Sequence, residues 1–368
     1  MSSTPHAIWL DADPGHDDAL ALLLALHSPA LRLLGVSSVS GNAAGLSTWH
    51  NAAKLLAAFG ASAEQVPLLR GCDVPLMRTP KAAPSIHGED GLGGVKGLPE
   101  LSSPSVQSHL KRTSDGPAPL ALVSHLTSLL RTRVEAGEEP LSIVATGPMT
   151  NIALLLRMAP SELLLKGVKQ IVLMGGNPGV SGNISPAAEF NFLVDPEAAR
   201  IVCDSPLPVI MAGLNVTHQA IWTRPLHAQL LSLGASPVRD VVSSAMEFFA
   251  AAYASQMGFA SGPPVHDFLC VAYLLDASLF APPTPSAANG QADEEAKRYR
   301  VEVQTSEGHN LGATVVAFHD QWPIEHEGWA AGGRNVRVLE HLDTERLWPL
   351  LFAAIERAEA RVASNVSS

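Results

Sequence analysis

Four carboxylates stand close together near the start of the chain, in the segment "WLDADPGHDD" at 9–18. Asp11 and Asp13 end an apolar run typical of a buried strand, and Asp17 and Asp18 follow a Pro-Gly turn. Carboxylates this close repel one another and raise each other's pKa values unless positive charge is near. Aspartates often cap a helix N-terminus, which would explain one or two of them. A hard divalent cation such as Ca²⁺ or Mg²⁺ explains the whole set, because these ions bind carboxylate oxygens.

Two further polar groups lie far downstream of this cluster. The segment "SGPPVHDFLC" at 261–270 places His266 and Asp267 just before an apolar helical pattern. This pair is either structural or catalytic, and the Gly-Pro-Pro lead-in indicates a fixed backbone there. The group "EFN" at 189–191 stands in apolar surroundings. It is either a hydrogen-bonded anchor of its loop or part of a site.

The elements that must position these groups alternate along the chain. The expected strands cover 7–13, 33–42, 141–148, 167–176 and 207–216, and the expected helices cover 16–28, 47–60, 149–159 and 195–205. This alternation predicts an α/β fold with an open, mostly parallel β-sheet flanked by helices. The long loops 72–94 and 176–191 both follow apolar strands. Because open α/β sheets bind ligands at the C-terminal ends of their strands, we expect the active site at that edge.

The composition limits the class of protein. The chain has 368 residues, 46% apolar and 16% charged, with a formal net charge of −11. No stretch is rich in Lys and Arg, so neither nucleic acid nor an anionic membrane is an expected partner. The longest apolar run, at 19–26, is too short to cross a bilayer, and the N-terminus lacks a signal-peptide pattern. With no CxxC spacing among Cys72, Cys203 and Cys270, a reduced cytoplasmic location is expected.

One domain is expected for residues 1–368. A segment at about 281–298 is rich in Pro and Ala and then charged, which predicts a flexible surface insertion in that domain.

Taken together, the motifs resemble those of the inosine-uridine preferring nucleoside hydrolases. The segment "DADPGHDDA" at 11–19 matches the N-terminal fingerprint of that family, D-x-D-P-G-x-D-D-A. The other blocks occur in order: "SGN" (40–42), "IHGEDGLGG" (86–94), "ATGPMTNIA" (145–153), "IVLMGG" (171–176), "GNISPAAEFNFLVDPEAA" (182–199) and "PVHD" (264–267). The resemblance extends from about residue 7 to about residue 350.

The resemblance implies a set of site residues. A Ca²⁺ ion would be bound by Asp13, Asp18, Asp267 and the backbone carbonyl of Thr146. The ribose would be held by Asp17, Asn42, Asn183, Glu189 and Asn191. Asp11 would support the strand end, and Met174 would either pack against the ribose or belong to the core.

The reaction implied is hydrolysis of the N-glycosidic bond of a small-molecule ribonucleoside, giving ribose and the free base. Such cleavage passes through an oxocarbenium-like transition state. Asp13 would act as general base toward a water activated by Ca²⁺, and His266 would assist departure of the base as general acid. His87 would close over the base on a mobile loop. The resemblance also implies a homodimer or homotetramer.

Several alternatives stay open from the residues alone. Uridine and inosine are the favoured substrates, and a purine-specific or nicotinamide riboside hydrolase is the alternative on the same fold. The base pocket is expected to border residues 246–262, where Tyr253 and Gln256 are candidates whose side chains the sequence does not place. A metal-dependent phosphohydrolase would need Lys or Arg near "DADPG", and that region has none. A non-catalytic nucleoside-binding protein would use the same residues.

Overall fold

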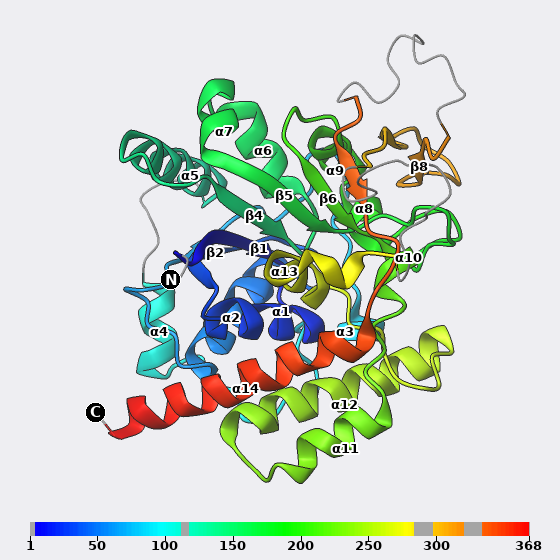
Figure 1. Cartoon of the computed structure of the whole chain (residues 1–368). Coiled ribbons are helices and arrows are strands. Elements are labelled where there is room, and N and C mark those ends of the chain that lie inside the picture. Colours follow the sequence, from blue (N-terminus) through cyan, green and yellow to red (C-terminus); the bar gives the residue numbers. More distant parts are fainter. Residues whose placement is uncertain (1–3, 112–117, 283–296, 320–332, 368) are drawn as a thin grey trace.

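The structure is a computed structural model that describes residues 4–111, 118–282, 297–319 and 333–367 (Figure 1). Residues 283–296, which make up most of the expected insertion at 281–298, lie outside the described residues, so that prediction is not tested.

Seven parallel strands form the central sheet, in the order β3-β2-β1-β4-β5-β6-β9. Their bounds are β1 His6–Ala12, β2 Leu31–Ser38, β3 Leu68–Arg70, β4 Leu141–Ala145, β5 Val168–Met174, β6 Val209–Ala212 and β9 Val336–Val338. A separate antiparallel pair is formed by β7 (Val301–Val303) and β8 (Thr314–Val316).

Helices connect most of the strands and extend the chain beyond them. Their bounds are α1 His16–His27, α2 Gly45–Ala58, α3 Pro84–His87, α4 Pro104–Leu110, α5 Ala118–Glu135, α6 Thr150–Met158, α7 Ser161–Gly167, α8 Phe190–Val194, α9 Pro196–Cys203, α10 Leu214–Thr217, α11 Arg224–Ser232, α12 Pro237–Met257, α13 Phe268–Leu275, the 3₁₀ helix η1 Ala277–Phe280 and α14 Thr344–Ser367. None of the described helices combines the length and the apolar character that a bilayer span requires.

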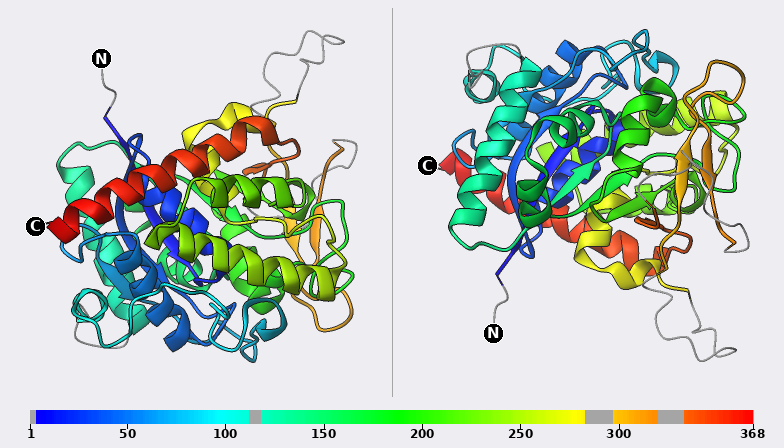
Figure 2. Two further views of the ribbon diagram at one scale, coloured as in Figure 1. Left: turned by 90° about the horizontal axis from the view of Figure 1, so that it is seen from below. Right: turned by 90° about the horizontal axis from the view of Figure 1, so that it is seen from above.

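The sheet is covered by helices on both faces (Figures 1 and 2). One core joins it to α1, α2, α12, α13 and α14, and a second core joins it to α5, α6, α7 and α9. Side chains of β1 alternate between the two cores, with Ile8 and Leu10 in the first and Trp9 in the second. A strand buried on both faces is typical of a parallel sheet, and it explains the continuous apolar run before Asp11.

The predicted fold class is confirmed, with differences at the strand ends. The strand expected at 33–42 ends at Ser38, and the strand expected at 207–216 ends at Ala212, because Leu214–Thr217 forms the one-turn helix α10. The strands β3 and β9 were not expected. Each has only three residues, too few to show an alternating pattern.

Candidate active site

A cavity of about 260 Å³ opens beside the C-terminal ends of the central strands. Ten of the twelve residues expected from the sequence line it: Asp17, Asn42, His87, Thr146, Met174, Asn183, Glu189, Asn191, His266 and Asp267. The other two, Asp13 and Asp18, are not among the lining residues and are buried. The fold therefore brings together residues that are up to 254 positions apart, from Asp13 to Asp267.

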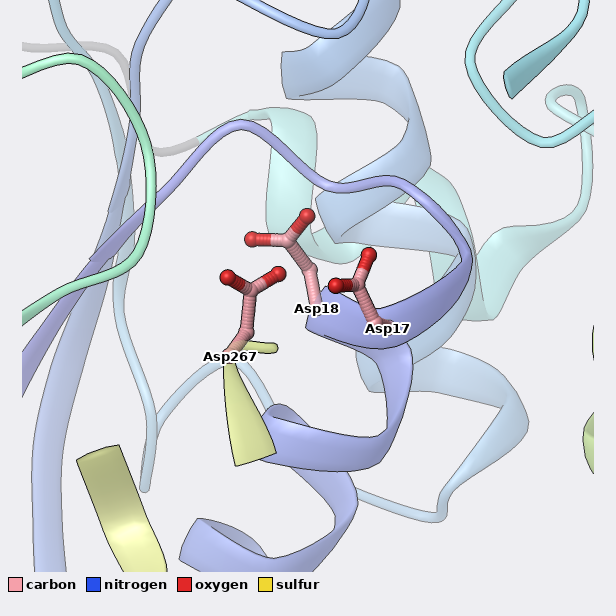
Figure 3. Close-up of side chains that lie close together, drawn as sticks. All are labelled: Asp17, Asp18 and Asp267. Atoms are coloured by element: carbon pink, nitrogen blue, oxygen red, sulfur yellow. The ribbon is translucent and has the colours of Figure 1, made fainter. Parts of the chain in front are cut away.

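Three carboxylates meet at one side of this cavity. Asp17 and Asp18 belong to the first turn of α1, and Asp267 immediately precedes α13 (Figure 3). Each of the three offers an oxygen atom, and these atoms lie within 4.8 Å of one another. All three side chains are buried. The first turn of one helix and the start of another thus supply three ligand atoms to a single small volume.

The backbone around α1 holds these carboxylates in place. The Gly15 amide donates to Asp18 Oδ2 over 2.9 Å, so Asp18 does cap its own helix. The Thr146 hydroxyl donates to Asp18 Oδ1 over 2.8 Å, and the His266 amide donates to Asp17 Oδ2 over 3.2 Å. Helix capping therefore explains the position of one oxygen of Asp18. It does not explain why Asp17 and Asp267 lie next to it.

Asp13 lies at the end of β1, tightly enclosed by backbone. Its Oδ2 accepts from the Asn42 amide over 2.7 Å, while its Oδ1 is buried and has no hydrogen-bond partner among the described residues. A Cβ atom on Gly41 would lie 2.0 Å from Oδ2, and one on Gly147 would lie 2.6 Å from Oδ1. Glycine is therefore required at both positions if Asp13 is to keep this place.

Burial dominates the electrostatics of the cluster. It raises the pKa of Asp17 to about 7, with the charge of Asp18 contributing, and raises the pKa of Asp267 well above its ordinary value. The pKa of Asp13 is also raised, first by burial and then by the charge of Asp18. Within the described residues, no Lys or Arg forms an ion pair with any of these carboxylates. The missing positive charge fits a metal cation.

The donor set fits a hard divalent cation. The close group contains Asp17, which the resemblance assigned to the ribose, together with the two expected metal ligands Asp18 and Asp267. Asp13, the third carboxylate expected as a metal ligand, is not in this close group, although its Oδ1 is buried and has no partner among the described residues. The expected Thr146 carbonyl accepts from Asn191 Nδ2 over 2.8 Å, and a carbonyl oxygen has two lone pairs. Oxygen donors of this kind are those that Ca²⁺ and Mg²⁺ bind.

Asp11 takes part in a separate network below the cluster. Its Oδ1 accepts from the Ser37 hydroxyl and, over 2.8 Å, from Asn151 Nδ2. Its backbone carbonyl accepts from the Thr146 amide over 2.8 Å. Burial raises the pKa of Asp11 to about 7. These bonds join the ends of β1, β2 and β4, which agrees with the supporting position expected for this residue.

The residues from the loop after β5 are partly anchors and partly lining. Glu189 caps α8, accepting from the amides of Gly176, Asn191 and Phe192 over 2.8–3.0 Å. Asn183 Oδ1 accepts from the Phe190 amide over 2.9 Å. Asn191 Nδ2 also lies 3.4 Å from Met174 Sδ. The segment "EFN" is therefore a hydrogen-bonded anchor of its loop, and its residues also line the cavity.

His266 lies between two hydroxyl groups. Its Nε2 is 2.7 Å from the Tyr253 hydroxyl, and its Nδ1 is 2.8 Å from Thr217 Oγ1. Burial lowers the pKa of His266 well below its ordinary value, so the ring is neutral near pH 7. Tyr253 and Gln256, which the sequence could not place, both line the cavity.

His87 differs from its expected setting on a mobile loop. It ends the short helix α3 and is buried, with its Nδ1 3.2 Å from His16 Nδ1. Sequence reasoning missed His16, because it occupies an unspecified position in the N-terminal fingerprint, and missed Thr217, because it directly follows the strand expected at 207–216 and no helix was expected there. For neither residue does the sequence carry a signal that would have found it.

Known proteins match nearly the whole chain in sequence. The family model described as "Inosine-uridine preferring nucleoside hydrolase" matches residues 8–349. The chain is 35% identical over 349 residues to the pyrimidine-specific ribonucleoside hydrolase RihA of Shewanella woodyi, covering 95% of this chain and 97% of the relative.

Solved structures match over almost the whole chain. A purine-preferring ribonucleoside hydrolase from Gardnerella vaginalis has a TM-score of 0.76 and 26% identity, with 96% of this chain and 99% of the other covered. A plant nucleoside hydrolase, the PpNRh1 enzyme, has a TM-score of 0.76 and 28% identity, with 97% and 100% covered.

Replacing Gly147 by Ala should weaken cation binding. The new Cβ would lie 2.6 Å from Asp13 Oδ1 and would push the carboxylate out of its place. We expect the Kd for Ca²⁺, measured by isothermal titration calorimetry, to rise at least about tenfold, the order expected when a supporting contact of a metal ligand is lost. An unchanged Kd in a folded variant would contradict the enclosure of Asp13 described above.

Replacing Glu189 by Gln should change how stability depends on pH in metal-free protein. Burial raises the pKa of Glu189 from 4.5 to about 7, so the folded state favours the protonated form. This contribution is present below pH 4.5 and is lost as the pH rises through 7. Between pH 5 and pH 8, wild-type protein should therefore lose on the order of 2 kcal/mol more unfolding free energy than Glu189→Gln.

Urea unfolding in the presence of chelator measures this difference at the two pH values. Parallel pH profiles for wild type and Glu189→Gln would show that the carboxyl group is already ionised in the folded state across this range.

Proposed function

The chain belongs to the inosine-uridine preferring nucleoside hydrolase family and is an N-glycosyl hydrolase that acts on ribonucleosides, and from that premise we propose a Ca²⁺-dependent reaction on nucleosides of the uridine and inosine type. The products are ribose and the free base. One observation carries the proposal. A single cavity is lined by the carboxylate residues Asp17 and Asp267 and by Tyr253.

The polar residues that line the cavity suit a ribose with both of its ring hydroxyls. Asp17, Asn42 and Asn191 are among them. The Nδ2 atoms of Asn42 and Asn191 donate within the protein. Hydroxyl groups can donate to the carboxylate oxygens of Asp17 and to the amide oxygens of the two asparagines, so the 2′- and 3′-hydroxyls would satisfy these acceptors. Without those hydroxyls, buried carboxylate oxygens would lack partners, which is strongly unfavourable.

Asp13, Asp18, Asp267 and the Thr146 carbonyl would hold the cation, with Asp17 beside it. A bound Ca²⁺ would supply Lewis acidity, which lowers the pKa of water. Asp13 is suited to act as general base, because its Oδ1 has no hydrogen-bond partner among the described residues. Burial, with the charge of Asp18, raises the pKa of Asp13 well above its ordinary value, which makes its carboxylate a stronger base. The negative charge of Asp17 and Asp267 would stabilise an oxocarbenium-like transition state.

Two further residues of the cavity lining, Tyr253 and His266, are suited to assist departure of the base. Tyr253 and His266 both line the cavity, and their hydrogen bond joins Tyr253 Oη to His266 Nε2. With Nε2 protonated, His266 donates to Tyr253 and leaves the phenol proton free to bind a nitrogen of the leaving base. Thr217 Oγ1 can then donate to Nδ1. His266 would thus assist departure of the base through Tyr253.

The choice of base is part of the proposal. One relative is named pyrimidine-specific and one solved structure is titled purine-preferring, so the names point in both directions. The family description supports uridine and inosine. No Lys or Arg forms an ion pair with the carboxylate cluster in the described part of the chain, which disfavours a phosphohydrolase. The resemblance supports a homodimer or homotetramer. The three free, buried cysteines support a reduced, cytoplasmic location.

Ribose release from a panel of nucleosides tests this proposal. We expect hydrolysis of uridine and inosine, loss of activity after chelation and recovery with Ca²⁺. The kcat/KM for uridine should exceed that for 2′-deoxyuridine by at least about 100-fold, because the buried polar groups at the sugar are left unpaired in the deoxy complex. Comparable kcat/KM values for the two substrates would contradict the assigned sugar contacts, and activity independent of metal would contradict the role of the cation.

Replacing His266 by Ala should affect substrates according to their leaving groups. For uridine or inosine, we expect kcat to fall by about 100-fold or more, the usual contribution of an acid catalyst. For p-nitrophenyl riboside, whose leaving group needs no proton, the loss should be much smaller. Tyr253→Phe should show the same pattern.

His218→Ala provides a matched control for His266→Ala. His218 contacts the His266 ring, with centroids 5.7 Å apart, and is not among the residues that line the cavity. It should not produce the difference between substrates. An equal loss on both substrates in His266→Ala would reject the acid role.

A further inference from the structure

His87 presents one ring nitrogen to a histidine partner and leaves the other free. Its Nδ1 lies 3.2 Å from His16 Nδ1 and 3.4 Å from the His16 backbone nitrogen. In the described part of the chain, no group hydrogen-bonds to Nε2 of His87, a residue that lines the cavity. Gly15 permits this approach, because a Cβ atom there would lie 2.5 Å from His87 Nδ1. The close contact between the two rings therefore requires glycine at position 15.

The other ring nitrogen of His16 fixes the direction of hydrogen bonding. His16 Nε2 lies 2.9 Å from the Gly93 carbonyl oxygen, which can only accept, so Nε2 carries a proton. The His16 ring is fully buried and stacked on Phe248 and Phe249, with centroids 5.0 Å and 5.5 Å away. A charged ring in these surroundings would be costly, and neither of its two hydrogen-bond partners is a carboxylate. A neutral His16 with Nε2 protonated therefore holds a lone pair at Nδ1.

The lone pair of His16 determines the tautomer of His87. We propose that His16 is a positioning residue that keeps His87 protonated at Nδ1, so that His87 offers a hydrogen-bond acceptor at Nε2 to the nucleobase. This inference rests on the proposed function for its substrate. It predicts selection of bases that present an N–H group on the edge facing His87, such as the ring N–H of uracil or hypoxanthine.

The backbone offers His87 the opposite arrangement. The His16 backbone amide is placed to donate to His87 Nδ1 over 3.4 Å, an arrangement in which Nε2 of His87 carries the proton. The shorter contact to the His16 ring opposes this tautomer in the wild-type chain. Removing the ring nitrogens of His16 should therefore reverse the polarity of His87 at the cavity, from acceptor to donor.

The experiment compares His16→Phe with wild type in the full-length protein loaded with Ca²⁺. Phe keeps an aromatic ring stacked on Phe248 and Phe249 but has no nitrogen. The ¹⁵N spectrum of histidine-labelled protein distinguishes protonated from unprotonated ring nitrogens, and His87→Gln assigns the His87 signals. We expect Nδ1 of His87 to be protonated in wild type and Nε2 to be protonated in His16→Phe.

A kinetic readout accompanies the spectrum. The ratio of kcat/KM for uridine to that for N3-methyluridine should fall at least about fivefold in His16→Phe, the scale of one hydrogen bond. His16→Asn should retain the wild-type tautomer and much of the ratio, because its side-chain oxygen can accept from His87 Nδ1. This variant also keeps the inference testable if His16→Phe does not fold.

His27→Phe is the matched control. His27 ends the same helix α1, and its Nε2 lies 2.9 Å from the Phe59 carbonyl, as His16 Nε2 does from Gly93. It should alter neither the His87 signals nor the substrate ratio. Protonation of Nε2 in wild type, or an unchanged tautomer in His16→Phe, would overturn the inference. If no nucleoside is hydrolysed by wild type, the proposed function fails, while the ¹⁵N spectrum still decides the role of His16.

Discussion

Buried carboxylates without a basic side chain beside them are the constraint on which the rest of this structure depends. Asp17, Asp18 and Asp267 converge within 4.8 Å, and Asp13 adds a buried oxygen with no partner among the described residues. Such a group is unfavourable in the metal-free protein, since burial and mutual repulsion both oppose ionisation. The fold has to hold it together against this repulsion and leave room for a cation. Much of the local backbone serves that purpose.

The means of holding the cluster lie at the ends of regular elements. Hydrogen bonds from the Gly15, Asn42 and His266 amides fix three of the carboxylates. A second layer joins the strand ends through Asp11, Ser37 and Asn151. Glycine stands where backbone must approach a carboxylate closely. Parallel strands suit this task, because their C-terminal ends all meet at one edge of the sheet.

The sequence was informative where the physical signal is local. The apolar run before Asp11 and the Pro-Gly turn after Asp13 predicted a strand and a helix start, and β1 and α1 lie there. The motif blocks predicted residues of which ten line one cavity. The three-residue strands β3 and β9 carry no periodicity and depend on pairing with distant strands. The contacts of His16 and Tyr253 depend likewise on distant helices, so no pattern in the chain could reveal them.

The residues that line the cavity come from several different helices, so related proteins can differ in one part of the lining and agree in another. The carboxylates stand on α1 and at the start of α13, whereas Ile86, Tyr253 and Gln256 line the cavity from α3 and α12. Substitutions on α3 and α12 can reshape the lining of the cavity while the three carboxylates stay in place. Under the proposed function, such substitutions would change the choice of nucleobase while the sugar chemistry stays constant; one relative is named for pyrimidines and one solved structure for purines.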